Sequence, residues 1–465
     1  MDKLMPHQEI GAGYLAGQPE ALLYWDQGVG KTPTAVVACD ISQKMSIEEG
    51  AEMLPILVIC PAVARRNWGR EFEKWQTRDR KIVVVESGKT DVTNADVIIC
   101  SYDAIVRGFG PTAFSGSYDV IILDELQYCK NVKALRTRSI FGTGGARGQG
   151  LVKRGRQLWA LSGTPAPNNI SEIYPWLRGA RPDLIRDHNG RVLSFTRFTH
   201  TFCDVEETRF GNVIRGNKKE PARELWSAMS DHVDRVRKQD VLQDLPPVRF
   251  SEVEVSGDKT AGQVRRLEET HRAEMNAVIN AIRGQGSSED ALFHLTTLRR
   301  ITELCKVGDT IDILTPELED QAIKKVCVFA TFIDSIEALV DGFSQFGAVT
   351  VHGQVPPKAR QSAIDNFMAD PDTRVFVGQI TAAGTAITLH ADGDCQDVLF
   401  VSADWVPSQN AQAVARVHRM GQTGSVHARF LHLANSIDES VVKTLMHKSR
   451  QLSDMVGEEG QHHAA

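Results

Sequence analysis

Two arginines in the carboxy-terminal part of the chain, Arg416 and Arg419, have a type and spacing suited to phosphoryl-transfer chemistry. They come long after a glycine-rich loop that ends in Lys31 and Thr32. Phosphoryl transfer needs cations around the charge on the transferred group, and an arginine supplied by a second domain can accelerate it by roughly 10³- to 10⁵-fold. The separation predicts an enzyme with two halves, in which ATP hydrolysis requires the halves to close.

The glycine-rich loop has the composition of a phosphate cradle. Gly28 and Gly30 precede Lys31 and Thr32, between a short apolar run and a helix-like segment. This order of strand, loop and helix places backbone amides against phosphates. We expect Lys31 to hold the terminal phosphates and Thr32 to bind Mg²⁺. The alternative is a glycine turn with a surface lysine, because Trp25 stands where the strict motif has its first glycine.

A second apolar run, 120–123, ends in the carboxylates Asp124 and Glu125. Open α/β sheets bind ligands at the carboxyl ends of their strands. We expect Asp124 to share the Mg²⁺ ion with the loop threonine and Glu125 to orient the attacking water. A strand that merely ends in solvated acids is the alternative, which the presence of Lys31 disfavours. Upstream, Gln8 is a candidate to bind an adenine edge, with a solvated glutamine as its alternative.

Parallel sheets are expected to position these residues, because short β-rich runs recur between helical patterns. The first series of predicted strands is 22–25, 56–60, 82–85, 97–100, 120–123 and 158–162, and the second is 326–330, 349–352, 375–378, 398–402 and 428–433. We predict an α/β fold with two lobes and helical insertions between them. The predicted domains are lobe one at 1–245, with a helical protrusion at about 172–240, a helical protrusion and hinge at 246–320, and lobe two at 321–465. Pro246 and Pro247 are the hinge candidates, because neither can donate a backbone hydrogen bond.

The composition fits a globular enzyme. The chain has 465 residues, of which 42% are hydrophobic, enough for two to four buried cores. No apolar stretch approaches the ~18 residues of a membrane span, and the eight cysteines form no Cys-x-x-Cys pair. We expect a soluble cytoplasmic protein with reduced cysteines and no membrane contact. Since the net charge is -6, DNA binding must depend on local basic surface.

A run without acidic residues, 130–156, is the strongest candidate for that surface. Its candidate DNA-binding residues are Lys130, Arg136, Arg138, Arg147 and Arg154. Each phosphate that such residues neutralise steepens the salt dependence of binding by about 0.9. The alternative is a solvated hairpin. Arg235, Arg237 and Lys238 form a second candidate patch, although a helical charge run is usually a solvated face.

Taken in order, these segments resemble the Swi/Snf-type family of ATP-dependent DNA translocases in helicase superfamily two. The segment 198–247 and the run from Arg416 to Thr423 resemble most the annealing-helicase branch, typified by HepA-related protein. The resemblance implies two RecA-like lobes, ATP and Mg²⁺ as cofactors, and double-stranded or branched DNA as partner. Segment 161–169 resembles the family's coupling motif. The resemblance implies nucleotide contacts by Gln8 and Gly384 and DNA contacts by Asn67, Trp68, Ser101, Tyr102, His352 and Thr381.

Two residues depart from the family pattern. Gln127 replaces a histidine in the acidic box, and Ala386 replaces a glycine in a later motif. Trp68 is also a candidate core residue, because it lies beside apolar sequence. The chain lacks the extra domains of eukaryotic members, which predicts a monomeric motor in a bacterium or a phage-infected cell.

Our leading hypothesis is an ATP-dependent translocase on double-stranded DNA, in which Lys31, Asp124, Glu125, Arg416 and Arg419 are catalytic. One alternative is a strand-separating helicase, although no wedge element is evident. A second, from another class, is an ATP-gated DNA clamp or regulatory subunit without turnover, which an intact Glu125 disfavours. RNA stays open as a substrate, since such motifs bind backbones rather than base sequence.

Overall fold

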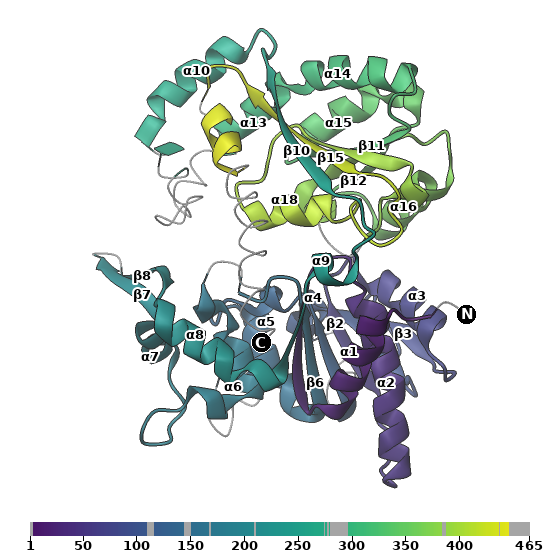
Figure 1. Cartoon of the computed structure of the whole chain (residues 1–465), viewed down its shortest axis with the longest axis vertical. Coiled ribbons are helices and arrows are strands. Elements are labelled where there is room, and N and C mark those ends of the chain that lie inside the picture. The colour runs from purple at the N-terminus through teal and green to yellow at the C-terminus, as the bar shows by residue number, and fades with distance from the viewer. Residues whose placement is uncertain are drawn as a thin grey trace. The chain divides into compact units, whose positions relative to one another are not determined.

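The computed structural model describes residues 3–108, 116–143, 150–166, 169–208, 211–273, 275–276, 279, 296–383, 387–436 and 438–445. The chain divides into two compact units, Met1–Gln243 and Asp244–Ala465 (Figure 1). In the described residues each unit carries one parallel sheet, which confirms the predicted α/β class with two lobes.

Unit one contains a seven-stranded parallel sheet in the order β3-β4-β2-β5-β6-β1-β9, as far as the structure describes the chain. The strands are β1 (Glu20–Trp25), β2 (Ile56–Cys60), β3 (Ile82–Val84), β4 (Val97–Ser101), β5 (Tyr118–Asp124), β6 (Gly155–Ser162) and β9 (Val233–Val236). The helices are α1 (Pro6–Gly17), α2 (Lys31–Glu48), α3 (Arg65–Trp75), α4 (Tyr102–Arg107), α5 (Leu135–Phe141), α6 (Tyr174–Ala180), α7 (Phe195–Phe202), α8 (Lys219–Ala228) and α9 (Lys238–Val241).

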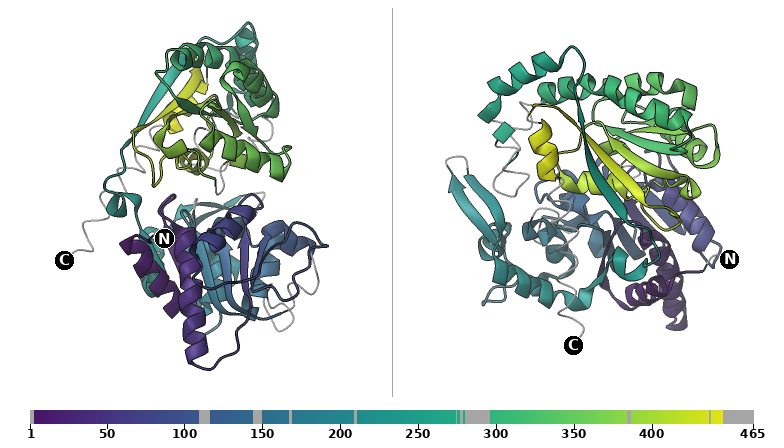
Figure 2. Two further views of the ribbon diagram at one scale, coloured as in Figure 1. Left: turned by 90° about the vertical axis from the view of Figure 1, so that its right-hand side faces the viewer. Right: turned by 45° about the horizontal axis from the view of Figure 1, so that its top comes forward.

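The central strands of this sheet are mostly apolar because helices cover both of its faces. Every residue of β2 and of β5 is buried. Helices α1 and α2 lie on one side of the sheet, and α5 and α6 lie on the other (Figure 1). An antiparallel hairpin of β7 (Cys203–Thr208) and β8 (Gly211–Asn217) projects from this unit (Figure 2). The segment predicted as a helical protrusion therefore combines helices with a hairpin.

Unit two contains a six-stranded parallel sheet in the order β10-β15-β14-β11-β13-β12 within its described residues. The strands are β10 (Val248–Val255), β11 (Lys325–Ala330), β12 (Val349–Val351), β13 (Val375–Gln379), β14 (Cys395–Phe400) and β15 (Val426–Leu433). The helices are α10 (Ala261–Thr270), α13 (Thr296–Cys305), α14 (Val307–Glu319), α15 (Ile333–Gly342), α16 (Pro357–Ala369), α17 (Ile380–Ala383) and α18 (Pro407–Val414).

Alternate side chains of these strands fill two separate cores, one on each face of the sheet. On one face, Val328 and Val377 pack with α14 and α15. On the other face, Phe329 and Phe376 pack with residues of α10, α13, α16 and α18. Phe400 and Phe430 stack in this second core, with ring centroids 4.4 Å apart. Both layers of helices hold the strand ends, and therefore the loops that follow them, in fixed positions.

Four of the described strands were not among the predicted ones. All eleven predicted runs form strands, but the hairpin strands β7 and β8 also occur, and so do β9 and β10, each at the edge of its parallel sheet. The prediction of a helical charge run at 235–238 is therefore wrong for Arg235, which lies on β9. Its guanidinium stacks over the Tyr24 ring and pairs with Asp26 at 2.8 Å. Because these contacts hold β9 to β1, this arginine has a structural role.

The described part of the chain includes no helix long and apolar enough to span a membrane. All eight cysteines are buried and free, as predicted.

Candidate nucleotide site and nucleic-acid interface

The loop between β1 and α2 has a backbone that only glycine adopts readily. Gly28 and Gly30 have φ angles of 81° and 90°, in the left-handed region where other residues are strained. A Cβ atom on Gly30 would come within 1.9 Å of Gln8 Nε2. Lys31 donates from Nζ to the carbonyl oxygens of Trp25 and Asp26, at 2.9 and 3.0 Å. The lysine therefore folds over the loop in which a phosphate would lie.

Gln8 is built into this loop and is only 2% exposed. Its Nε2 donates to Val29 O at 3.1 Å, and its Oε1 accepts from Met5 N at 2.9 Å. The alternative of a solvated glutamine is therefore wrong. The neighbouring His7 ring also lies 2.9 Å from the Val29 carbonyl oxygen. Both side chains of α1 fix the loop, and the contact of Gln8 with adenine stays a prediction.

The acidic pair lies at the carboxyl end of β5, two strands from β1 and next to β6. Asp124 and Glu125 are 7% and 6% exposed, so neither is a solvated strand end. Trp68 donates from Nε1 to Asp124 Oδ2 at 2.8 Å, and the Tyr102 hydroxyl donates to Asp124 O at 2.7 Å. Glu125 has a φ of 57°, an unusual conformation for a residue other than glycine, of a kind that clusters at functional sites.

Gln127 connects the acidic box to the end of β6. Its Nε2 donates to Glu125 Oε2 at 2.6 Å, and its Oε1 accepts from the Ser162 hydroxyl at 2.7 Å. The Ser162 hydroxyl in turn accepts from Thr164 N at 3.0 Å. The residue that departs from the family pattern thus forms a continuous chain of hydrogen bonds from Glu125 to the segment that resembles the coupling motif.

The lining of the loop fits a phosphate-bearing ligand. Gln27 Nε2 and Thr164 Oγ1 are buried and have no hydrogen-bond partner in the described part of the chain. A Cβ atom on Gly163 would lie 3.1 Å from Gln27 Nε2, so the coupling segment packs directly on the loop. Unpaired buried donors are costly, and a phosphate oxygen would satisfy them. The oxygens of Thr32 and Asp124 suit Mg²⁺, which prefers oxygen ligands.

In unit two, the structure brings together two segments that were predicted to act on the nucleotide. Arg419 donates from Nη1 to Ile387 O at 3.1 Å and to Thr388 Oγ1 at 2.7 Å. Leu389 N donates to Arg416 O at 2.9 Å. Arg416 follows α18 and is only 5% exposed. The arginine motif is therefore packed against the segment that follows α17 instead of lying loose on the surface.

The next residues of this motif reach the predicted hinge. His418 Nε2 lies 2.8 Å from Pro246 O, in the double-proline segment that leads into β10. Gln422 Nε2 donates to Cys395 O at 2.8 Å, where β14 begins. These contacts tie the arginine motif both to the sheet and to the start of unit two.

The predicted DNA contacts of unit two lie where β12 and β13 end. His352 follows β12 and is 7% exposed, whereas Thr381 lies on α17 and is exposed. Gly353 N donates to Gln379 Oε1 at 3.1 Å and so links the two strand ends. Because parallel strands end at the same edge, both residues belong to one edge of this sheet.

The predicted DNA contacts of unit one differ in accessibility. Asn67 is partly exposed on α3, but Trp68 and Tyr102 are 1% and 2% exposed. Their polar side-chain atoms are bound to Asp124, and the DNA contact of the two residues stays a prediction. Ser101 is 6% exposed, and its hydroxyl accepts from Ala104 N at 3.2 Å to cap α4. Trp68 and Tyr102 thus hold Asp124 in place, and Ser101 caps the helix that begins with Tyr102.

Several residues of the basic run are already bound within unit one. Lys130 pairs with Glu172 at 3.1 Å, and the Arg136 guanidinium lies 5.7 Å from the Tyr128 ring centroid. Arg138 and Arg154 are exposed. Arg147, Gly384 and Ala386 lie outside the described residues. Lys130 is itself exposed beside its partner, and the DNA contact of the run stays a prediction.

The fold and the site define the class: a two-lobed α/β protein with a phosphate-binding loop and an acidic box joined to a coupling segment. Residues 7–307 match the SNF2-related domain, and residues 306–421 match the helicase conserved C-terminal domain. The chain belongs to the SNF2-related family, which confirms the resemblance seen in the sequence.

Curated relatives cover almost the whole chain. It is 24% identical over 472 residues to "DNA annealing helicase and endonuclease ZRANB3" of Bos taurus, covering 97% of this chain and 40% of that protein. It is 28% identical over 450 residues to "SWI/SNF-related matrix-associated actin-dependent regulator of chromatin subfamily A-like protein 1 homolog" of Caenorhabditis elegans, covering 94% of this chain and 60% of that protein. The chain thus spans about half the length of these relatives.

A solved structure supports the fold. The Pyrococcus furiosus Hef helicase domain aligns with a TM-score of 0.50 at 13% identity, over 95% of this chain and 97% of that one. This similarity bears on the two-lobed architecture alone.

Proposed function

We propose that the chain is an ATP-dependent translocase on double-stranded DNA. The observation that carries the proposal is the hydrogen-bonded path from Glu125 through Gln127 to Ser162, beside the loop that holds Lys31. Such a path links the carboxylate next to the reaction to a segment that can respond to DNA. Membership of the SNF2-related family supports the choice of activity.

Each residue of unit one has a defined role in this proposal. Lys31 exchanges its carbonyl partners for the terminal phosphates of ATP, a change that needs only rotation of its flexible side chain. Glu125 orients the attacking water, and its buried position keeps the carboxylate directed at one place. When bound, Mg²⁺ neutralises phosphate charge, and Thr32 and Asp124 are the residues that would hold it.

Arg416 and Arg419 of unit two are proposed to complete the reaction. Both are anchored by their own unit through backbone and side-chain hydrogen bonds, so a movement of unit two would carry them as one body. Cycles of closing and opening would then shift the DNA contacts of one unit relative to those of the other. Double-stranded or branched DNA is the proposed partner, and one of the relatives is named as a DNA annealing helicase.

The direct test is ATP hydrolysis with and without duplex DNA. We expect the rate to rise by about 10-fold or more when duplex is added, because binding would order both units around the nucleotide. A rate that duplex leaves unchanged would contradict the proposal. Single-stranded DNA and RNA duplex of equal length are the controls for substrate class.

A strand-separating helicase is the second candidate within the enzymes. Displacement of a labelled strand from a forked duplex distinguishes it from a translocase that leaves the strands paired. Absence of turnover with every nucleic acid would instead support an ATP-gated clamp. A monomeric motor in the cytoplasm of a bacterium or a phage-infected cell stays a prediction.

A further inference from the structure

Three side chains in unit two, none of them assigned to the nucleotide or to DNA, form a cluster with the chemistry of a metal site. They are Glu254 on β10, His432 on β15 and Glu439 on the helical segment 438–445. One ligand atom from each lies within 4.8 Å of the others. Glu254 and His432 are direct partners in the parallel pairing of β10 with β15. Three separate elements therefore converge on one point.

The imidazole of His432 is an unusual member of this cluster. Its side chain is 3% exposed, and Nδ1 is buried with no hydrogen-bond partner among the described residues. Its Nε2 lies 4.0 Å from Glu252 Oε2, beyond hydrogen-bond distance. A buried polar nitrogen without a partner costs free energy, and binding a metal ion is one way to satisfy it.

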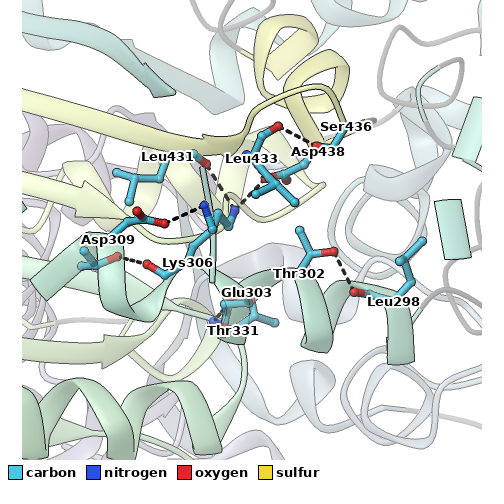
Figure 3. A network of polar contacts seen from close by, with 12 residues as sticks. Leu298, Thr302, Glu303, Lys306, Asp309, Thr331, Leu431, Leu433, Ser436 and Asp438 are labelled. Carbon is cyan, nitrogen blue, oxygen red and sulfur yellow. Dashed lines mark hydrogen bonds and ion pairs between the residues drawn. The ribbon is translucent and has the colours of Figure 1, made fainter. Parts of the chain in front are cut away.

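A rigid framework fixes the segments that carry His432 and Glu439. Lys306 is fully buried and donates from Nζ to Leu431 O at 3.3 Å and to Asp438 Oδ2 at 2.7 Å (Figure 3). Asp438 Oδ2 also accepts from Leu433 N at 3.1 Å. These bonds hold both neighbours of His432 and the residue before Glu439. The geometry of the cluster is thus imposed by the core.

We propose that Glu254, His432 and Glu439 bind a divalent first-row transition metal ion, with Zn²⁺ as the best-suited example. An imidazole nitrogen and carboxylate oxygens are ligand types that zinc sites use, and three such ligands would leave one coordination position open. Mg²⁺ is disfavoured, because it prefers oxygen ligands alone. The bound ion would link the edge strand β10 and the segment 438–445 to β15.

Lys443 is the competing explanation for the acidic side chains. Its ammonium lies 2.5 Å from Glu439 Oε1, and this contact holds the pKa of Glu439 below its ordinary value. The lysine side chain is 55% exposed. It can therefore swing into solvent when a divalent cation takes its place.

The test is a titration of the full chain with Zn²⁺ after removal of metals by a chelator and without nucleotide. The parent protein for all of these measurements carries His462→Ala and His463→Ala, so that these two histidines do not contribute to Zn²⁺ binding. Calorimetry is expected to show one Zn²⁺ per chain with a Kd below about 10 µM, and the midpoint of thermal unfolding should rise by about 2 °C or more.

His432→Gln is expected to weaken Zn²⁺ binding by about 10- to 100-fold and to abolish the thermal shift. His427→Gln is the matched control, since His427 lies on the same strand and is paired with Ser251. Glu254→Gln changes an exposed side chain and should also weaken binding, even if His432→Gln folds poorly. Lys443→Met should strengthen it.

Equal Zn²⁺ affinity in the parent, His432→Gln and Glu254→Gln would overturn the proposal. A loss of Zn²⁺ affinity in His427→Gln equal to that in His432→Gln would also overturn it, because the ion would then bind elsewhere on unit two. A parent chain that binds no Zn²⁺ while Lys443→Met also binds none would identify the cluster as a simple ion pair. ATP turnover is not a readout here, so failure of this site leaves the proposed function untouched.

Discussion

Gln127 is the residue that joins the acidic box of unit one to the end of β6. It bonds Glu125 on one side and Ser162 on the other, and both of these partners are almost fully buried. A glutamine amide donates from nitrogen and accepts on oxygen, so it can join a carboxylate to a hydroxyl without taking up a proton. The departure from the family's histidine therefore makes this link independent of protonation.

We predict that Gln127→Ala lowers kcat by about 10-fold, because the substitution removes two hydrogen bonds from a preorganised site. The kcat measured with duplex DNA should fall more than the kcat measured without it. The affinity for ATP should change little. Steady-state kinetics with and without duplex measure both quantities. Gln127→His should restore part of the stimulation, and a loss of ATP affinity instead of kcat would assign Gln127 to substrate binding.

Lys31→Ala and Arg416→Ala are predicted to fail in different ways. Both should lower turnover by about 10³-fold or more, since each removes a cation from the transferred phosphate. Only Lys31→Ala should weaken ATP binding strongly, because Arg416 belongs to the other unit and is expected to act on the transition state. Binding of a fluorescent ATP analogue separates the two, and equal losses of affinity would refute the role given to Arg416.

Local motifs made part of the site predictable. The loop of Lys31 and the carboxylates of Asp124 and Glu125 each follow an apolar run, so their positions at strand ends could be read directly. The hydrogen bond from Trp68 to Asp124 could not be predicted from a local motif, because it joins residues 56 positions apart. Only the folded chain shows that this tryptophan, on the buried side of α3, holds the Asp124 carboxylate.

At the scale of elements, central strands were easier to predict than edge strands. Runs such as 56–60 and 120–123 are continuously apolar because both faces are covered. β9 and β10 lie at sheet edges and carry charged residues, and no residue of β9 is fully buried. Their sequences therefore resemble charged loops or helices. Val248 and Phe250 show a short alternation that could have indicated β10.

The packing of the short helix η7 (Ala391–Gly393) against the arginine motif makes unit two sensitive to acid. Burial, and next the charge of Arg419, hold the pKa of His390 below its ordinary value. As pH falls through about 6.5, the unfolded chain binds a proton at this position while the folded chain does not. This histidine therefore contributes stability above that pH, and the contribution is lost as pH falls towards the folded pKa.

We predict that His390→Asn reduces the fall in thermal midpoint between pH 7.5 and pH 5.5. Asparagine keeps an acceptor for Asp392 N, to which His390 Nδ1 now binds at 3.0 Å, and it does not titrate. Thermal unfolding of both proteins across this range is the measurement. An identical fall in the two proteins would show that His390 does not contribute to the acid sensitivity.

At the scale of the whole molecule, the two units carry different candidate functional segments. Unit one holds the phosphate loop, the acidic box and the coupling segment, whereas unit two holds the arginine motif and its own DNA candidates. His418 Nε2 lies within hydrogen-bond distance of Pro246 O, in the double proline at the start of unit two. The chain that connects the units is therefore bonded to the arginine motif. In the proposed mechanism, movement of one unit relative to the other would convert ATP hydrolysis into movement along DNA.

Displacement of a labelled third strand from a triplex tests this account most directly, because a protein that moves along duplex DNA removes the third strand without separating the other two. We predict displacement that requires ATP and Mg²⁺ and is lost in Lys31→Ala and in Arg416→Ala. ATP hydrolysis by the intact chain on the same triplex without any displacement of the third strand would contradict the claim that it is a translocase.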